Sequence, residues 1–201
     1  MINSVILILL SVILFTHCGS SPPIQKYILT PSIEYDTETL SGKENTEITI
    51  GIGSIEFSEY LKRPEIVSFK GNNELNVDQF NRWAEPLEKN FERVLIENLS
   101  RLIPTNRIYI FPWQEEEPNS FQISIVVNEF GMRSDSSLVL DARWNVSNKF
   151  KRDFLMTQRT FYTENAAGVS IEGKVALLSD LVGKFSSDIA NEIRKQTDRG
   201  F

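Results

Sequence analysis

The spacing of apolar residues changes along this 201-residue chain, and it predicts where strands and helices lie. In residues 46–57 isoleucines alternate with small or polar residues, a period of two that is typical of a strand. The stretch 65–75 predicts a second strand that turns at Gly71 and the two following asparagines into a hairpin. A short strand over residues 25–31, ended by Pro31, precedes both.

Two later stretches follow the helical spacing of three and four residues. The first runs from residue 78 to residue 104, and its apolar positions are Phe80, Trp83, Leu87, Phe91, Val94, Leu95, Leu99 and Leu102. Because Pro86 is tolerated only in the first turn of a helix, we expect residues 78–84 to form a separate preceding turn and Pro104 to end the helix. The second stretch predicts a helix over residues 175–196.

Between these helices, strands are predicted at residues 107–112, 121–130, 136–147 and 154–164. The order strands, helix, strands, helix predicts an α+β fold, with a mainly antiparallel mixed sheet and two long helices packed on one face. The other face is not obviously polar, because the last strand places Phe154 on one side and Phe161 on the other. A sheet face of that kind needs a partner, and we therefore expect a homo-oligomer.

The N-terminus carries a different pattern, an apolar run over residues 5–15 that is broken only by Ser11. Eleven residues are too few to span a bilayer but fit the apolar part of a secretory signal. The run ends in Phe-Thr-His-Cys, which resembles a bacterial lipobox whose cysteine is acylated after cleavage. A lipobox normally has Gly, Ala or Ser where His17 stands, so a free or intermolecularly paired Cys18 remains the alternative. The predicted organisation is a signal peptide at 1–17, a lipidated tether at 18–25 and a single domain at 26–201.

Acylation of Cys18 would decide where the protein works. A lipoprotein cysteine carries two or three fatty chains, and two or more chains hold a protein stably on a membrane without spanning it. Gly19 directly after the cysteine favours the outer membrane, so we expect a periplasm-facing lipoprotein of the cell envelope. Only about seven residues separate Cys18 from Lys26, so the domain must lie close to its membrane.

Composition excludes several classes of function. The net charge of −6 argues against a nucleic-acid partner, which requires clustered Lys and Arg. The only histidine is His17, and cleavage before Cys18 would remove it, which excludes Ser-His-Asp and Cys-His catalysis and His or Cys zinc sites. No phosphate-binding glycine loop is present. We therefore expect no catalytic residues, no metal and no cofactor besides the lipid on Cys18, with carboxylate-only chemistry as the remaining enzymatic alternative.

Several stretches resemble the auxiliary lipoproteins of ABC-type lipid transporters. They are "YILTP" after the cysteine, "IGIGSIEFSEYLKRPEIV" at 50–67, "RWAEPLEKNFERVLIENLSRLI" at 82–103, "FPW" at 111–113 and "DARWNV" at 141–146. The resemblance covers nearly the whole predicted mature chain and implies a non-catalytic adaptor. It implies as partners an MCE-domain protein with an ABC permease and ATPase, which move phospholipid between two membranes. The lipoprotein would dock the transport conduit to a membrane, as a ring of copies.

Within the resembling stretch, a loop with Tyr60, Leu61, Arg63 and Pro64 is predicted as a partner interface, because aromatic residues are enriched at interfaces. The alternative is that Tyr60 and Leu61 only cover the edge of the sheet. A function of another class also remains open, a lipoprotein regulator or accessory subunit of a cell-wall synthase or secretion pore. The short tether favours a docking role over one that reaches across the periplasm.

Overall fold

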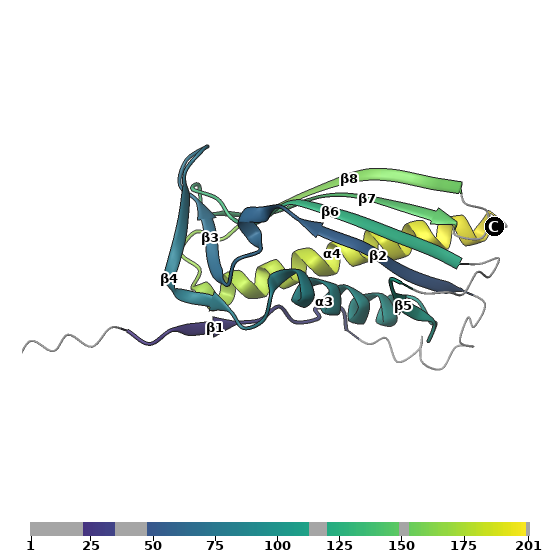
Figure 1. Cartoon of the computed structure of the whole chain (residues 1–201), viewed down its shortest axis with the longest axis horizontal. Helices are drawn as coiled ribbons and strands as arrows, with labels where there is room; N and C mark the ends of the chain where they lie inside the picture. Colours follow the sequence, from purple (N-terminus) through teal and green to yellow (C-terminus); the bar gives the residue numbers. More distant parts are fainter. Residues whose placement is uncertain (1–21, 35–47, 113–119, 149–152, 200–201) are drawn as a thin grey trace, which may run out of the picture.

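The computed structural model describes residues 22–34, 48–112, 120–148 and 153–199, which form one mixed eight-stranded sheet and two α-helices packed against it (Figure 1). The strands are β1 (Gln25–Tyr27), β2 (Thr49–Phe57), β3 (Glu65–Phe69), β4 (Leu75–Trp83), β5 (Ile108–Ile110), β6 (Ser120–Met132), β7 (Ser137–Asn148) and β8 (Asp153–Asn165). The helices are α3 (Leu87–Leu102) and α4 (Ile171–Asp198), and a 3-10 turn, η1, covers Glu59–Leu61. The predicted α+β fold is confirmed.

Strand β6 organises the sheet. It pairs in parallel with β2 along one edge and antiparallel with β7 along the other, and β8 continues the antiparallel ladder. Where β2 ends, β3 takes over the same edge of β6 through the pair Ser68 and Met132. The hairpin of β3 and β4 then extends the sheet, and β1 adds to β4 in parallel. Strand β5 pairs in parallel with β2.

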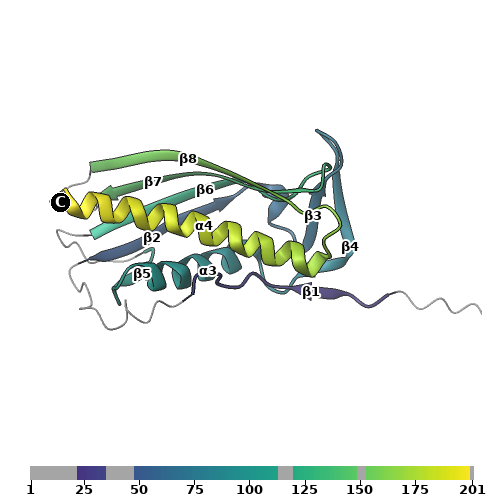
Figure 2. The same ribbon diagram turned by 180° about the vertical axis from the view of Figure 1, so that it is seen from behind.

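Both helices cover the same face of the long strands, and α4 runs along almost the whole sheet (Figure 2). The molecule therefore has two distinct ends (Figure 1). We call the end that carries β1, β3 and β4 the β4 end. The opposite end, which carries β5 and the C-terminal part of α4, is the β5 end.

The core between sheet and helices is centred on aromatic rings. Phe91 of α3 is fully buried, and its ring centroid lies 5.4 Å from that of Phe57, 5.7 Å from that of Phe130 and 6.2 Å from that of Phe185. The ring of Phe185 meets Trp144 edge-on at 5.8 Å. Edge-to-face contacts of this kind add to the free energy gained by burial. One side chain thus joins α3 to β2, β6 and α4.

One predicted element is wrong. Phe80 and Trp83 do not lie in a turn preceding the helix, because residues 75–83 form strand β4. The backbone N–H of Trp83 donates to the carbonyl of Pro64, and Pro86, with φ −52° and ψ 125°, is the N-cap of α3. A proline disfavours the helical region for the residue before it, here Glu85, and Pro86 itself has an extended ψ, so the helix begins at Leu87. The helical spacing of Phe80 and Trp83 with Leu87 is coincidental. The predicted end before Pro104 is confirmed, since α3 ends at Leu102.

The expectation that the second sheet face is broadly apolar is also wrong for the described residues. Of the large apolar side chains that are exposed there, Val126 and Phe161 stand apart, separated by Asp141 and Arg143. The β7–β8 register shifts between Met156 and Phe154, which leaves Leu155 outside the regular pairing, so strict alternation does not assign the face of each residue in this apolar run. The homo-oligomer prediction therefore loses the support of an apolar outer face.

No helix in the described part of the chain is both long and apolar enough to cross a bilayer. Nor do the described residues include three or more His, Cys, Asp or Glu side chains grouped so that they could hold a metal ion.

The outer face is instead organised by ion pairs. Arg159 donates from Nε and from one terminal nitrogen to the two carboxylate oxygens of Asp141, each at 2.8 Å, while the Asp141 side chain is only 8% exposed. This hydrogen-bonded pairing holds the pKa of Asp141 below its ordinary value, and the charge of Arg143 lowers it further.

Replacing Phe91 tests the packing of the core. We expect Phe91→Ala to lower the free energy of unfolding by about 3–5 kcal/mol, because the buried ring leaves a cavity between both helices and the sheet. Urea denaturation followed by tryptophan fluorescence measures it. Phe161→Ala is the matched control. Its ring is 49% exposed and contacts Arg133, so we expect a loss below about 1 kcal/mol. Equal losses in the two variants would contradict this account of the core.

The pairing of Asp141 predicts a pH dependence. Because its pKa is depressed in the folded state, its stabilisation is present above the ordinary carboxyl pKa of about 4 and is lost as the pH falls through the folded pKa. We expect Arg159→Gln to raise the Asp141 pKa, measured by carboxyl NMR, and to be less stable than the wild type at pH 7. This difference should shrink below about pH 4. Arg143→Gln, which keeps the bidentate pair, should raise the pKa less.

Candidate docking site at the β4 end

Residues 22–34, which we call the strap, connect the N-terminal part of the chain to the body of the domain. The strap begins at the β4 end as β1 and then passes along α3 and α4 (Figure 1). The carbonyl of Tyr27 accepts from the N–H of Ala84, after which the strap leaves the sheet. Leu29 is fully buried in the core. A force acting on the N-terminal segment would therefore reach the helices through the strap.

A buried asparagine on α3 replaces strand pairing where the strap leaves the sheet. The Asn90 Oδ1 accepts a hydrogen bond from the Leu29 N–H at 2.6 Å, and its Nδ2 donates to the Leu29 carbonyl at 3.1 Å. One amide side chain thus satisfies both backbone groups of a buried residue, as a neighbouring strand would. Asn90 is 1% exposed, so water does not compete for these bonds.

Further contacts hold the C-terminal half of the strap. The Thr30 N–H donates to the Ser179 hydroxyl at 3.2 Å, and one Arg101 terminal nitrogen donates to the Ile33 carbonyl at 2.6 Å. Gly183 of α4 leaves room for the strap, because a Cβ at this position would lie 2.2 Å from Ser32 Oγ. Helices α3 and α4 therefore hold the strap through these hydrogen bonds and through the close contact of Gly183 with Ser32.

The loop predicted as a partner interface precedes β3, which β4 separates from the strap, and it divides into buried and exposed parts. Leu61 is 5% exposed and belongs to the core. The half-buried Tyr60 packs edge-on against Phe69 at 5.7 Å, and its hydroxyl donates to the Asn128 carbonyl at 3.4 Å. Arg63 and Pro64 are exposed, and Arg63 Nε donates to Glu65 at 3.1 Å. Of the predicted residues, Arg63 and Pro64 are the most accessible to a partner, while Tyr60 and Leu61 fix the loop on the sheet.

Desolvation, with a smaller contribution from Glu129, raises the pKa of Tyr60 to about 12. The hydroxyl therefore keeps the proton that it donates to the Asn128 carbonyl even at moderately alkaline pH.

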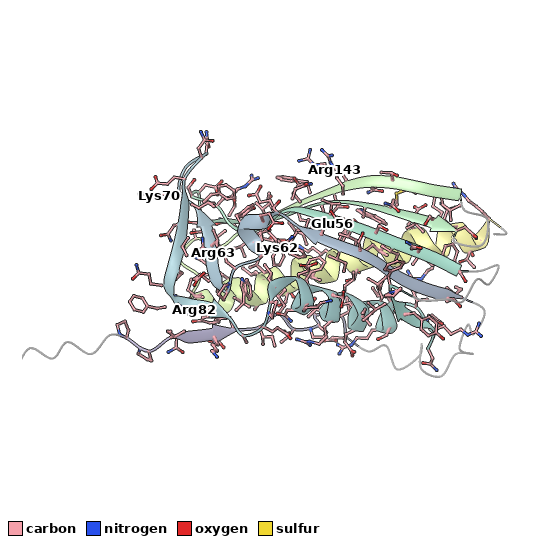
Figure 3. The ribbon with its side chains drawn as sticks, in the orientation of Figure 1. Glu56, Lys62, Arg63, Lys70, Arg82 and Arg143 are labelled. Atoms are coloured by element: carbon pink, nitrogen blue, oxygen red, sulfur yellow. The ribbon has the colours of Figure 1, made fainter. Side chains whose placement is uncertain are left out.

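Basic side chains gather around this end. Figure 3 shows Lys62, Arg63, Lys70 and Arg82 on and beside the β3–β4 hairpin, whereas Arg143 lies over the long strands. An open groove of about 560 Å³ lies between the hairpin turn and the β6–β7 turn. Two of its charged side chains pair with each other, since Arg133 forms two hydrogen bonds to the Glu129 carboxylate at 2.6 and 2.5 Å. Neither the basic side chains at the β4 end nor the groove resembles a catalytic centre. Both are compatible with a surface that contacts a partner protein or a membrane.

Sequence reasoning missed the asparagine contacts of the strap. A signal was present, because Asn90 and Asn98 lie within the apolar stripe of α3, where an uncompensated amide would be costly. This signal does not identify the hydrogen-bond partner, because Leu29, the partner of Asn90, lies 61 residues away in the sequence. Cys18, the predicted acylation site, lies outside the described residues.

The sequence matches the family described as the ABC-type transport auxiliary lipoprotein component over residues 27–190. The chain therefore belongs to this family, and it is an auxiliary lipoprotein of ABC-type transport in the cell envelope. The family is non-catalytic, which bears out the prediction that the protein is not an enzyme.

Individual relatives agree with this assignment. The intermembrane transport lipoprotein PqiC of Escherichia coli (strain K12) is 20% identical over 192 residues, covering 94% of this chain and 97% of the relative. A crystal structure of a Xanthomonas campestris protein is similar with a TM-score of 0.71, over 87% of this chain and 99% of that one, at 9% identity. A crystal structure of an uncharacterised protein gives 0.69, over 86% and 99%, at 17% identity. Both structures show the same fold.

The strap contacts predict a local opening when Asn90 is changed. In Asn90→Ala the N–H and carbonyl of Leu29 lose their partners, so we expect trypsin to cut after Lys26 roughly 10–100 times faster than in the wild type. Mass spectrometry of the released fragment measures the rate. Asn98→Ala is the graded control, because it loses one 3.4 Å bond from the strap at Ile33 and one 3.4 Å bond to Ser186 of α4, and it should change this rate much less. An Asn90→Ala strap that stays resistant would show that the amide does not hold it.

Proposed function

We propose that this protein is a membrane-anchored, periplasm-facing adaptor of an MCE/ABC-type phospholipid transport system, and that it docks the transport conduit to a membrane. Cys18 carries the acyl anchor, residues 1–17 are the signal peptide, and residues 26–201 form the single working domain. The anchor lies in the outer membrane. The partners are the MCE-domain protein and its permease and ATPase.

The observation that carries this proposal is the family match over residues 27–190. The alignment with an intermembrane transport lipoprotein along nearly the full length of both chains supports the same role. At 20% identity the lipid that is moved and the contacts with partners are not transferred from that relative.

The structure supports docking through its mechanical design. The predicted tether is short, and the strap, which begins within it, is hydrogen-bonded to both helices through Asn90, Ser179 and Arg101. An acyl group on Cys18 would therefore be coupled to the folded body rather than to a loose linker. Such coupling is useful for a protein that must hold a large assembly at a membrane.

Extraction of the protein from native membranes in mild detergent tests the proposal. We expect an MCE-domain protein with its permease and ATPase to co-purify, and the N-terminal peptide to carry acyl chains on Cys18. Mass spectrometry reads both, and native mass measurement of the purified adaptor reads the number of copies. Co-purification of a cell-wall synthase or a secretion pore in place of the transporter would overturn the proposal. An unmodified Cys18 would remove the anchor from it.

Arg63→Glu tests the predicted interface within the same experiment. The residue is exposed at the β4 end, so reversing its charge should lower recovery of the MCE-domain protein by about 3–10-fold without unfolding the adaptor. Arg143→Glu is the matched control, because it reverses an exposed arginine over the long strands. Loss of the partner in Arg143→Glu alone would move the interface to the outer face of the sheet.

A further inference from the structure

Two exposed apolar side chains occur at the β4 end, where β1 and β4 pair. The parallel register pairs Gln25 with Asn81 and Lys26 with Arg82, and Ile24 and Phe80 are the residues directly before the first of these pairs. Ile24 is 50% exposed and Phe80 is 39% exposed. Ile24 lies in the last part of the predicted tether, directly before β1, and Phe80 lies on β4, the strand that pairs with β1.

The second pair of the β1–β4 register is cationic. Lys26 and Arg82 are paired in the β1–β4 ladder and follow Ile24 and Phe80 by two residues in the sequence. Arg82 is held only loosely, with one terminal nitrogen 3.7 Å from a Glu65 oxygen and with an Nε that has no hydrogen-bond partner within the described ranges. Lys26 is exposed. These four residues, Ile24, Lys26, Phe80 and Arg82, form what we call the edge patch.

Covalent geometry limits how far the edge patch lies from the acylated residue. Six residue steps separate Cys18 from Ile24, so their Cα atoms are at most roughly 20 Å apart in any conformation. Two apolar side chains, Ile24 and Phe80, thus lie near two cationic ones and close to the proposed acyl anchor. A membrane interface presents the same order, with acyl chains below charged headgroups. Apolar side chains enter the acyl boundary, and Lys and Arg reach the phosphates.

We propose that the edge patch rests in the membrane that carries the anchor, with Ile24 and Phe80 at the acyl boundary and Lys26 and Arg82 on anionic headgroups. The inference rests on the proposed acylation of Cys18 and adds an orientation of the body. A second copy of the chain is a poorer occupant. The surface area of two apolar side chains and two like-charged ones is far smaller than the roughly 800 Å² that each partner buries in a stable protein interface.

A fluorescent probe at position 80 tests the inference. The chain has one cysteine, so acylation of Cys18 leaves Phe80→Cys as the only reactive thiol in the mature protein. The acylated variant is labelled with nitrobenzoxadiazole and reconstituted into vesicles of phosphatidylethanolamine and phosphatidylglycerol that contain doxyl-labelled phospholipid. We expect the probe to lose roughly half of its fluorescence, because an interfacial side chain lies about 5–10 Å into the headgroup and acyl boundary. Phe161→Cys is the matched control, since Phe161 is 49% exposed on the outer face, and its probe should keep its fluorescence.

The outcomes separate the inference from the function on which it rests. Equal quenching at positions 80 and 161, or none at 80, in protein whose Cys18 is acylated overturns the edge patch and leaves the adaptor role intact. A probe at position 80 that is shielded from aqueous iodide but not quenched by doxyl lipid identifies a protein neighbour and also overturns it. Protein that does not float with the vesicles and takes label on Cys18 overturns the anchoring as well.

The cationic half of the patch has its own test. Lys26→Gln combined with Arg82→Gln should reduce quenching at position 80 in vesicles with phosphatidylglycerol by at least about twofold, because two headgroup attractions are lost. In vesicles of neutral lipid the same double variant should match its parent. Arg143→Gln combined with Lys195→Gln removes two charges elsewhere and should leave quenching unchanged. Quenching that falls equally in both double variants contradicts a role for Lys26 and Arg82.

Discussion

The fold depends on the position of the Phe91 ring between the sheet and the second helix. This one side chain touches aromatic residues of β2, β6 and α4, so it fixes both how far α3 stands from the sheet and how α3 is rotated about its axis. That rotation decides where the preceding residue points. Asn90 is thereby placed at the backbone of Leu29, where it satisfies both of its hydrogen-bonding groups. Two adjacent residues of α3 therefore have separate roles: Phe91 packs in the core, and Asn90 holds the strap.

Much of the fold follows from residue spacing, and the failures have physical causes. The strands β2, β6 and β7 and the helix α4 show clear periods because each directs its large apolar side chains at regular intervals into the same core. Strand β4 was mistaken for a helical turn because Trp83 and Leu87 are both buried by the same core, although one belongs to a strand and the other to a helix. The polarity of the outer face was misjudged at Leu155, where a register shift breaks the alternation. Such shifts depend on the partner strand, which a single sequence does not specify.

The candidate site was predictable only in part, for a related reason. The loop at Tyr60 to Pro64 stood out by composition, but which of its side chains are buried depends on Phe69 and Asn128, which lie on other strands. The strap contacts were not predictable in detail, since they join residues far apart in sequence. Polar groups across the described surface mostly serve each other, as in the pairs Arg133 with Glu129 and Arg159 with Asp141. This pairing of charged side chains agrees with a family that is non-catalytic.

Helix α4 gives the domain a fixed dimension. Its 28 residues correspond to a rod about 40 Å long, which runs from beside β1 to the β5 end. The exposed Phe111, directly after β5, lies at that far end. With the β4 end at a bilayer, one continuous helix rather than a chain of loops would set the height of the β5 end above the lipid. A subunit that binds at the β5 end would then lie at a fixed distance from the membrane, and the length of α4 would determine the spacing between membrane and conduit.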